Sequence, residues 1–137
     1  MALLDVNALV ALGWDSHVHH HAIREWFVRE SGSGWQTCPT TESGFVRVSS
    51  NPRVLTHRID VDSAIQFLDL LKRSGGHSFL PDDVSVTDPD FPAIDGYRQV
   101  TDAYLLTLAR RNSVPLVTFD SAIAGMAGPG EVTLLST

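Results

Sequence analysis

The chain has 137 residues with a formal net charge of −6, and 43% of them are hydrophobic and 19% charged. This length predicts one domain over residues 1–137 with a core of its own, and the composition excludes a disordered chain, a collagen-like fibre and a disulfide scaffold. The acidic net charge also argues against a protein that coats nucleic acid generally, because such proteins need a basic face.

The first part of the chain is predicted to alternate short strands with helices. Apolar runs predict strands at 2–5 and 35–38, and helices are predicted at 7–11, 17–30, 39–48 and from Asp62 to a stop at Gly75. Asp15 or Ser16 is expected to cap the helix at 17–30. The side chains expected to face the core are Val18, Ala22, Ile23, Trp26 and Phe27 in that helix, and Ile65, Leu68 and Leu71 in the helix that begins at Asp62.

The second part continues this alternation around a long loop. Residues 81–97 contain three prolines and five aspartates, and this composition predicts a loop with Asp-rich turns. A strand is predicted at 78–80, and after the loop come a helix at 99–112, a strand at 115–118, a helix at 121–126 and a strand at 132–135. Strands that alternate with helices predict an α/β domain with a central, mainly parallel sheet flanked by helices.

The sequence also bears on where the chain resides. Cys38 is the single cysteine, so no disulfide forms within the chain, and the first residues carry no basic leader. No apolar stretch approaches the roughly 20 residues that span a bilayer. We therefore expect a cytoplasmic chain without a membrane segment, in which Cys38 is a small buried filler.

Four acidic residues stand at or near the predicted carboxyl ends of the strands. Asp5 ends the first strand, Asp120 follows the strand at 115–118, Glu42 lies on the helix after the second strand, and Asp102 lies near the start of the helix at 99–112. Ligands of open parallel sheets bind at this edge. Carboxylates gathered there repel one another unless cations neutralise them, and Mg²⁺ or Mn²⁺ prefers such oxygen ligands. The set predicts metal-assisted phosphodiester cleavage.

Helix capping is the alternative interpretation of the same acids. An aspartate that follows a strand often accepts a backbone N–H bond at the start of the next helix, and its charge suits that helix end. For any one of the four residues capping is a sufficient explanation, whereas for all four together a metal site competes with it.

The segments LLDVNALVAL, TESGFVRV, GYRQVTDAYLLTLA and LVTFDSAI resemble the PIN-domain ribonucleases, and most closely the VapC toxins of bacterial toxin–antitoxin pairs. The resemblance covers essentially the whole chain in order, spacing and length. It implies a PIN-like three-layer α/β domain that acts as a Mg²⁺-dependent endoribonuclease, the toxin of a type II pair. Cleavage would proceed through a water activated by the metal, without a side-chain nucleophile.

The resemblance also assigns site residues. Asp5 and Asp102 would anchor the first Mg²⁺, for which Mn²⁺ is a substitute, and Glu42 and Asp120 would complete its shell directly or through water. Further polar residues of the pocket would be Asn7 and Thr118. The implied partners are a VapB-type antitoxin, an RNA substrate and a second copy of the chain in a homodimer.

Five arginines are candidates for an RNA path, although each is also an ordinary solvated charge. They are Arg47, Arg53, Arg98, Arg110 and Arg111. Trp14 and Trp35 flank predicted loops and are open candidates for base stacking, whereas Trp26 has the spacing of a core residue. His17 and His21 are four residues apart, but without further ligands a solvated helix face is favoured over a zinc site.

Two rival functions remain open at this point. An Asp-dependent phosphatase usually has a second Asp two residues after the first, where this chain has Asn7, and a Lys near the pocket, for which Lys72 is the sole candidate. A PIN-like protein that binds RNA or a partner without cleavage is the non-enzymatic alternative. Chelator sensitivity of RNA cleavage separates this alternative from a nuclease.

Overall fold

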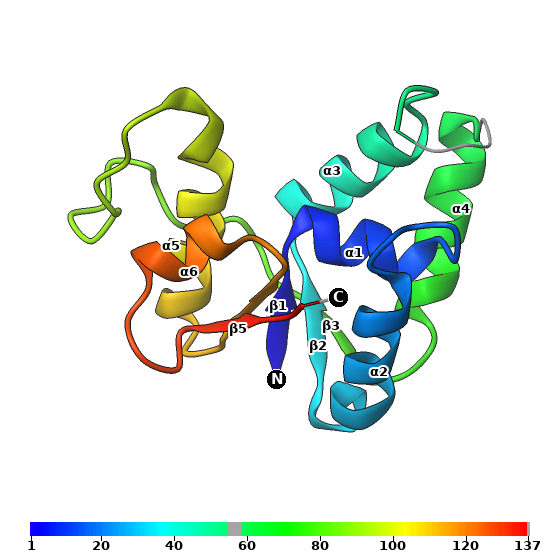
Figure 1. Cartoon of the computed structure of the whole chain (residues 1–137), viewed down its shortest axis with the longest axis horizontal. Coiled ribbons are helices and arrows are strands. Elements are labelled where there is room, and N and C mark those ends of the chain that lie inside the picture. The colour runs from blue at the N-terminus through cyan, green and yellow to red at the C-terminus, as the bar shows by residue number, and fades with distance from the viewer. Residues whose placement is uncertain (55–58, 137) are drawn as a thin grey trace.

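In the computed structural model, which describes residues 1–54 and 59–136, five strands form one parallel sheet (Figure 1). They are β1 (Ala2–Leu4), β2 (Trp35–Thr37), β3 (His77–Phe79), β4 (Leu116–Thr118) and β5 (Val132–Leu134), in the order β3-β2-β1-β4-β5. Leu3 of β1 pairs with Gln36 on one side and Leu116 on the other. The predicted α/β class is confirmed, and the strand order changes direction beside β1, where ligands of such sheets bind.

Helices cover both faces of this sheet. They are α1 (Val6–Gly13), α2 (His20–Glu30), α3 (Pro39–Ser49), α4 (Val61–Lys72), α5 (Val100–Arg111) and α6 (Ser121–Met126), with short 3₁₀ turns η1 (Ser31–Ser33) and η2 (Tyr97–Gln99). In Figure 1, α1 to α4 lie to the right of the sheet and α5 and α6 lie to the left. The chain therefore has the three-layer arrangement that the resemblance implies.

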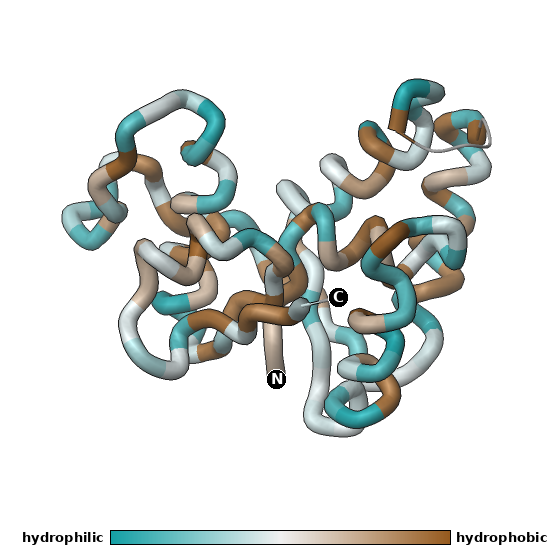
Figure 2. Tube along the Cα trace, in the orientation of Figure 1, coloured by the Kyte–Doolittle hydropathy of each residue, from teal (hydrophilic) through white to brown (hydrophobic). Residues whose placement is uncertain are grey.

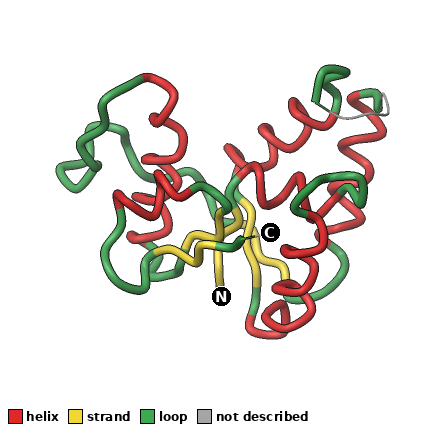
Figure 3. The backbone as a smooth tube through the Cα atoms, viewed as in Figure 1, coloured by secondary structure: helices red, strands yellow, loops and turns green. Residues whose placement is uncertain are grey.

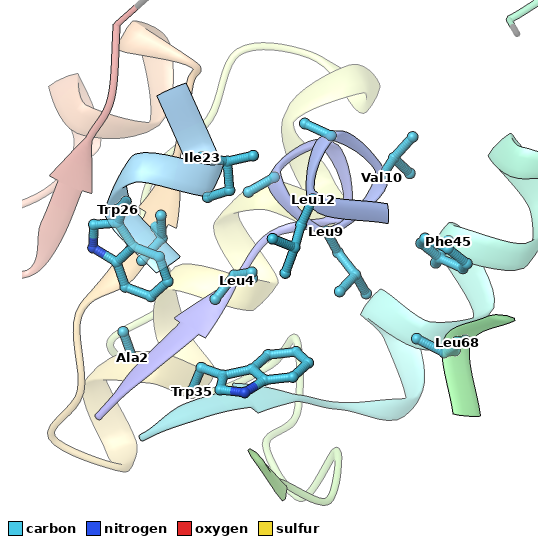
Figure 4. Packing of buried hydrophobic residues seen from close by; sticks show 13 residues of the cluster. Ala2, Leu4, Leu9, Val10, Leu12, Ile23, Trp26, Trp35, Phe45 and Leu68 are labelled. Carbon is cyan, nitrogen blue, oxygen red and sulfur yellow. The ribbon is translucent and has the colours of Figure 1, made fainter. Parts of the chain in front are cut away.

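Two buried clusters hold the layers together, one on each face of β1. Ala2 and Leu4 pack with α1, α2, α3 and α4, whereas Leu3 packs with α5 and α6. The alternation follows from the strand geometry, which points successive side chains to opposite faces. Figure 4 shows the first cluster, where Trp35 lies below Leu4 and Leu9, and Figure 2 shows hydrophobic residues along β5.

Two details of the helices differ from the sequence prediction. Helix α2 begins at His20 rather than residue 17, because backbone turns from Trp14 to His20 precede it, and neither Asp15 nor Ser16 caps it. Val18 therefore lies outside the helix and is 74% exposed, although Ile23 and Trp26 are buried as expected.

In α4 the buried stripe is narrower than predicted. Ala64 and Leu68 are buried and Leu71 packs against the core, but Ile65 is 50% exposed. Asp60, not Asp62, caps this helix by accepting the Ser63 N–H at 2.7 Å. The helix lies at the outside of the domain with α3 as its main neighbour, so a narrow stripe suffices to hold it.

The loop at 81–97 has no helix or strand before η2, as predicted (Figure 3). Its aspartates tie it to the domain, because Asp82 accepts hydrogen bonds from Thr40 and Asp88 accepts them from Arg111. Among the residues described, no helix is long and apolar enough to cross a membrane.

Candidate active site

Asp5 stands between the last residue of β1 and the first residue of α1. Its Oδ1 accepts the Ala8 N–H at 2.8 Å, so it caps α1, and its Oδ2 accepts the Thr118 hydroxyl at 2.5 Å. The side chain is only 4% exposed. Burial raises the pKa of Asp5 to about 6, the two hydrogen bonds oppose the rise, and the charges of Asp102 and Asp120 add to it.

Asp120 and Asp102 reach the same place from other elements. Asp120 follows β4 and caps α6 by accepting the Ala122 N–H at 2.8 Å, and its own N–H donates to the Thr118 hydroxyl oxygen at 3.0 Å. Asp102 lies in the first turn of α5 without a capping role. Burial and the charge of Asp120 raise the pKa of Asp102. Capping therefore accounts for two of these acids and leaves Asp102 unexplained.

These three carboxylates line one cavity of about 220 Å³. The rest of its lining is Asn7 and the apolar residues Val6, Val10 and Val48. Thr118 lies behind Asp5, fully buried. Within the described part of the chain no basic side chain lines this cavity, so its negative charge has no protein counter-ion there.

The donor set suits a hard divalent cation, because Mg²⁺ and Mn²⁺ prefer carboxylate oxygens and Mg²⁺ retains several waters. Over residues 1–54 and 59–136, no three Asp, Glu, His or Cys side chains already stand close enough to chelate one ion. The cavity therefore fits a cation held partly through water, with Asp5, Asp102 and Asp120 around it.

Glu42, the fourth predicted acid, makes its contacts away from this cavity. Its Oε2 accepts the Lys72 ammonium at 2.9 Å and the Thr37 hydroxyl at 2.6 Å. Since the Thr37 hydrogen is used there, the His77 Nε2 at 2.8 Å must donate to the Thr37 oxygen. Burial and the charge of Lys72 lower the pKa of His77. The lowered pKa favours a neutral imidazole that carries its proton on Nε2.

The winding of α3 explains this placement. Gly44 packs so closely on α1 that a Cβ there would lie 2.6 Å from Val6 Cγ2, and Val48, one turn later, lines the cavity. Glu42 lies about 160° around the helix from Gly44, because each residue turns an α-helix by about 100°. The structure thus brings Asp5, Asp102, Asp120, Asn7 and Thr118 together and leaves Glu42 on the opposite side of α3.

Comparison with known proteins identifies the family of this chain. Residues 2–129 match the PIN domain family. Ribonuclease VapC38 of Mycobacterium tuberculosis is 62% identical over 127 residues, which cover 93% of this chain and 90% of the relative. Ribonuclease VapC39 of the same organism is 46% identical over 137 residues, with 98% and 99% covered. The chain belongs to the PIN-domain family, in its VapC group of ribonucleases.

Solved structures agree at the level of the fold. The crystal structure of VapBC2 from Rickettsia felis bound to a promoter DNA fragment matches with a TM-score of 0.66 at 11% identity, covering 98% of both chains. Mycobacterium tuberculosis VapC20, a sarcin-ricin loop cleaving toxin, matches with a TM-score of 0.62 at 10% identity, covering 93% of this chain and 97% of that one. At these identities the likeness shows a shared PIN fold.

Two of the candidate RNA-binding arginines of this PIN domain are engaged in ion pairs. Arg110 donates to both carboxylate oxygens of Glu131, at 2.7 and 3.1 Å, and Arg111 contacts Asp88. Arg110 also stands eight residues beyond Asp102, which is about 12 Å along α5. The structure therefore does not place the side chains of Arg110 and Arg111 at the cavity lined by Asp5, Asp102 and Asp120.

Arg47 and Arg98 differ from that pair. Arg47 precedes Val48 of the cavity wall, and Arg98 lies in η2, two residues before α5 and four before Asp102. Both lie at the surface, and neither forms an ion pair with another described residue. They are the predicted arginines that lie near cavity residues in the sequence, Arg47 on α3 and Arg98 in η2.

Within residues 1–54 and 59–136, His17 and His21 do not gather with other ligands into a metal site. His21 is exposed and pairs with Glu25 at 3.3 Å on α2, while His17 lies in the turns before that helix. The sequence prediction of a solvated helix face, rather than a zinc site, therefore agrees with the position of His21. Sequence reasoning missed the group of Lys72, Thr37 and His77 around Glu42, since no local spacing links three separate elements.

Proposed function

We propose that this VapC-type ribonuclease is the toxin of a type II toxin–antitoxin pair, and that it cleaves RNA phosphodiester bonds with Mg²⁺, or Mn²⁺ in its place. The observation that supports this most is the cavity lined by Asp5, Asp102 and Asp120 without a basic side chain from the described residues. Such a cavity needs an external cation, and a cation among carboxylates is the requirement of metal-assisted phosphodiester hydrolysis.

Each residue has a role in this proposal. Asp5 is the best oriented ligand, because the Ala8 N–H and the Thr118 hydroxyl fix both of its oxygens and leave a free lone pair on each. Asp102 and Asp120 supply the remaining carboxylates. Bound there, Mg²⁺ would lower the pKa of a coordinated water and stabilise the charge that develops on the phosphate. Asn7 would donate its amide N–H to a phosphate oxygen.

Glu42 has a more distant part in the proposal. Its carboxylate is held by Lys72 and Thr37, so it would act on the cation through water or after leaving Lys72. Arg47 and Arg98 would lead the RNA backbone to the cavity, since they are the arginines near cavity residues in the sequence and have no carboxylate partner among the described residues.

The partners follow from the family. We propose a VapB-type antitoxin, a homodimer and a cytoplasmic site of action, and the likeness to the VapBC2 complex supports the first of these. Co-expression with the protein encoded beside it, followed by size-exclusion chromatography with light scattering, tests the complex and the stoichiometry. A chain that stays monomeric and binds no such protein would contradict this part of the proposal.

The test of the activity is RNA cleavage by the purified chain with and without chelator. We expect cleavage with Mg²⁺ or Mn²⁺, none in excess EDTA, and none for Asp102→Asn. Asp62→Asn is the matched control, because Asp62 is also in the first turn of its helix but is exposed. The double change of His17 and His21 to Ala should likewise leave cleavage within a few-fold of the parent.

The rivals give different results in the same assays. A binding-only PIN protein retains RNA without cutting it in either metal. A phosphatase hydrolyses p-nitrophenyl phosphate, which we do not expect, because Lys72 is paired with Glu42 outside the cavity and Asn7 replaces the second aspartate.

A further inference from the structure

Tyr97 has the most exposed large hydrophobic side chain among the residues that the structure describes, at 81%. The two tryptophans that the sequence left open for base stacking are different. Trp35 is fully buried and therefore unavailable for base stacking, and Trp14 packs on Phe67 with ring centres 4.5 Å apart. A single exposed apolar residue is ordinary on a protein surface, so its surroundings decide what it means.

Tyr97 lies in the turn that leads into the helix of Asp102, and it is not part of the lining of the carboxylate cavity. The turn η2 continues directly into α5, whose first turn carries Asp102. Tyr97 lies about 8 Å before Asp102 along this axis, from the rise of 3₁₀ and α-helical residues. The turn is well defined, because Gln99 donates its N–H to the Gly96 oxygen and accepts the Asp95 N–H, both at 3.1 Å. The ring is therefore presented by a fixed turn.

Arg98 completes the surface around the ring. Its guanidinium carbon lies 5.7 Å from the centre of the Tyr97 ring, and its Nε donates to the Tyr97 hydroxyl at 3.3 Å. The spacing of four residues puts Arg98 on the same side of the helix as Asp102. An aromatic face and a cation without an ion pair among the described residues thus stand together in the turn before α5.

RNA is the ligand that uses both groups. Single-stranded RNA is recognised by stacking unpaired bases on aromatic rings or guanidinium planes, while cations take the phosphates. Because the chain carries a net charge of −6, it gains little affinity from long-range attraction of the RNA backbone. Stacking does not depend on that attraction, so it can supply affinity that this acidic surface lacks.

We propose that Tyr97, together with Arg98, is a platform on which an unpaired base of the RNA substrate stacks. This inference rests on the proposed ribonuclease function and adds a binding residue to it. Tyr97 positions the RNA, and Asp5, Asp102 and Asp120 remain the residues of the cation site.

The test measures the affinity of Asp5→Asn protein, which we expect not to cut because it lacks a carboxylate of the cation site, for a fluorescein-labelled RNA hairpin with an unpaired loop. Adding Tyr97→Ala should weaken binding by about 5- to 150-fold, which corresponds to the 1–3 kcal/mol of one stacked base. Tyr97→Phe and Tyr97→Trp should retain the affinity. In a salt series, Arg98→Met should lower the salt slope by about one, while Tyr97→Ala should leave the slope unchanged.

Phe79→Ala is the matched control, because Phe79 is also an exposed aromatic but lies on β3, the edge strand on the far side of β2 from β1. It should bind the hairpin as the background protein does. The inference is overturned if Tyr97→Ala binds the hairpin equally well, or if it changes the elution volume of the protein and not its RNA affinity, which would identify a protein interface. If the parent chain neither binds nor cuts RNA, the proposed function itself fails.

Discussion

The buried carboxyl of Asp5 predicts that removing its charge stabilises the metal-free protein at neutral pH. The change is Asp5→Asn, which keeps the shape of the side chain. Its Oδ1 can still accept the Ala8 N–H, and its amide can donate to the Thr118 hydroxyl oxygen. The variant therefore loses the charge but also the acceptor of the Thr118 hydroxyl hydrogen. That lost hydrogen bond does not depend on pH, so the change of the stability difference with pH reports the cost of the charge.

The magnitude follows from the pKa of Asp5, which rises from 3.8 to about 6 on folding. This rise corresponds to about 3 kcal/mol, because each tenfold change in proton affinity is worth about 1.4 kcal/mol. Between about pH 4 and pH 6 the native state holds a proton that the unfolded chain has lost, so the stability of the parent falls as the pH rises through this window. Asparagine has no such proton, and its stability relative to the parent should rise by about 3 kcal/mol toward pH 7.

The assay is urea unfolding in EDTA, followed by tryptophan fluorescence at several pH values. Asp62→Asn, at an exposed position, corrects for the general pH dependence. An advantage of Asp5→Asn that is constant with pH, or that grows toward acid, would refute the reasoning. Mg²⁺ at a hundredfold excess over Kd should bring the two proteins close to equal stability, because it stabilises the parent by about 2.7 kcal/mol and the variant far less.

Further predictions concern Glu42 and the packing of α3. Glu42→Gln should weaken Mn²⁺ binding, measured by electron paramagnetic resonance, less than Asp102→Asn does, because Lys72 holds Glu42 away from the cavity; equal losses would contradict this. Gly44→Ala should lower the free energy of unfolding by about 1–3 kcal/mol, since its Cβ would lie 2.6 Å from Val6 Cγ2. An unchanged denaturation midpoint would show that α3 moves at no cost.

The sequence by itself determined the elements and most of the candidate site. Apolar runs followed by Asp5 and Asp120 predicted two central strands and the edge to which both acids point, because parallel strands end at the same edge of a sheet. The structure agrees on every strand and on the loop at 81–97. These features depend on patterns of a few adjacent residues, which can be read without knowing what packs against them.

Local patterns failed where a distant neighbour decides. The predicted start of α2 was wrong because turns after Trp14 come before the helix. Ile65 was expected in the core from its helical spacing, but the spacing does not show how wide a stripe the neighbouring helix covers. The sequence also did not reveal that Tyr97 is exposed and Trp35 buried. Both aromatic residues lie at or beside a turn, where no periodic pattern indicates which side chain faces the core.

The four acids show this division most clearly. Their presence near the strand ends was determined by the sequence, but their grouping was decided by the tertiary structure. The side chains of Asp5, Asp102 and Asp120 converge because β1, β4 and α5 meet at the centre of the sheet. Glu42 is drawn aside because the winding of α3 turns it toward Lys72, thirty residues away in the chain, and an ion pair between separate elements has no signature in the residues around either partner.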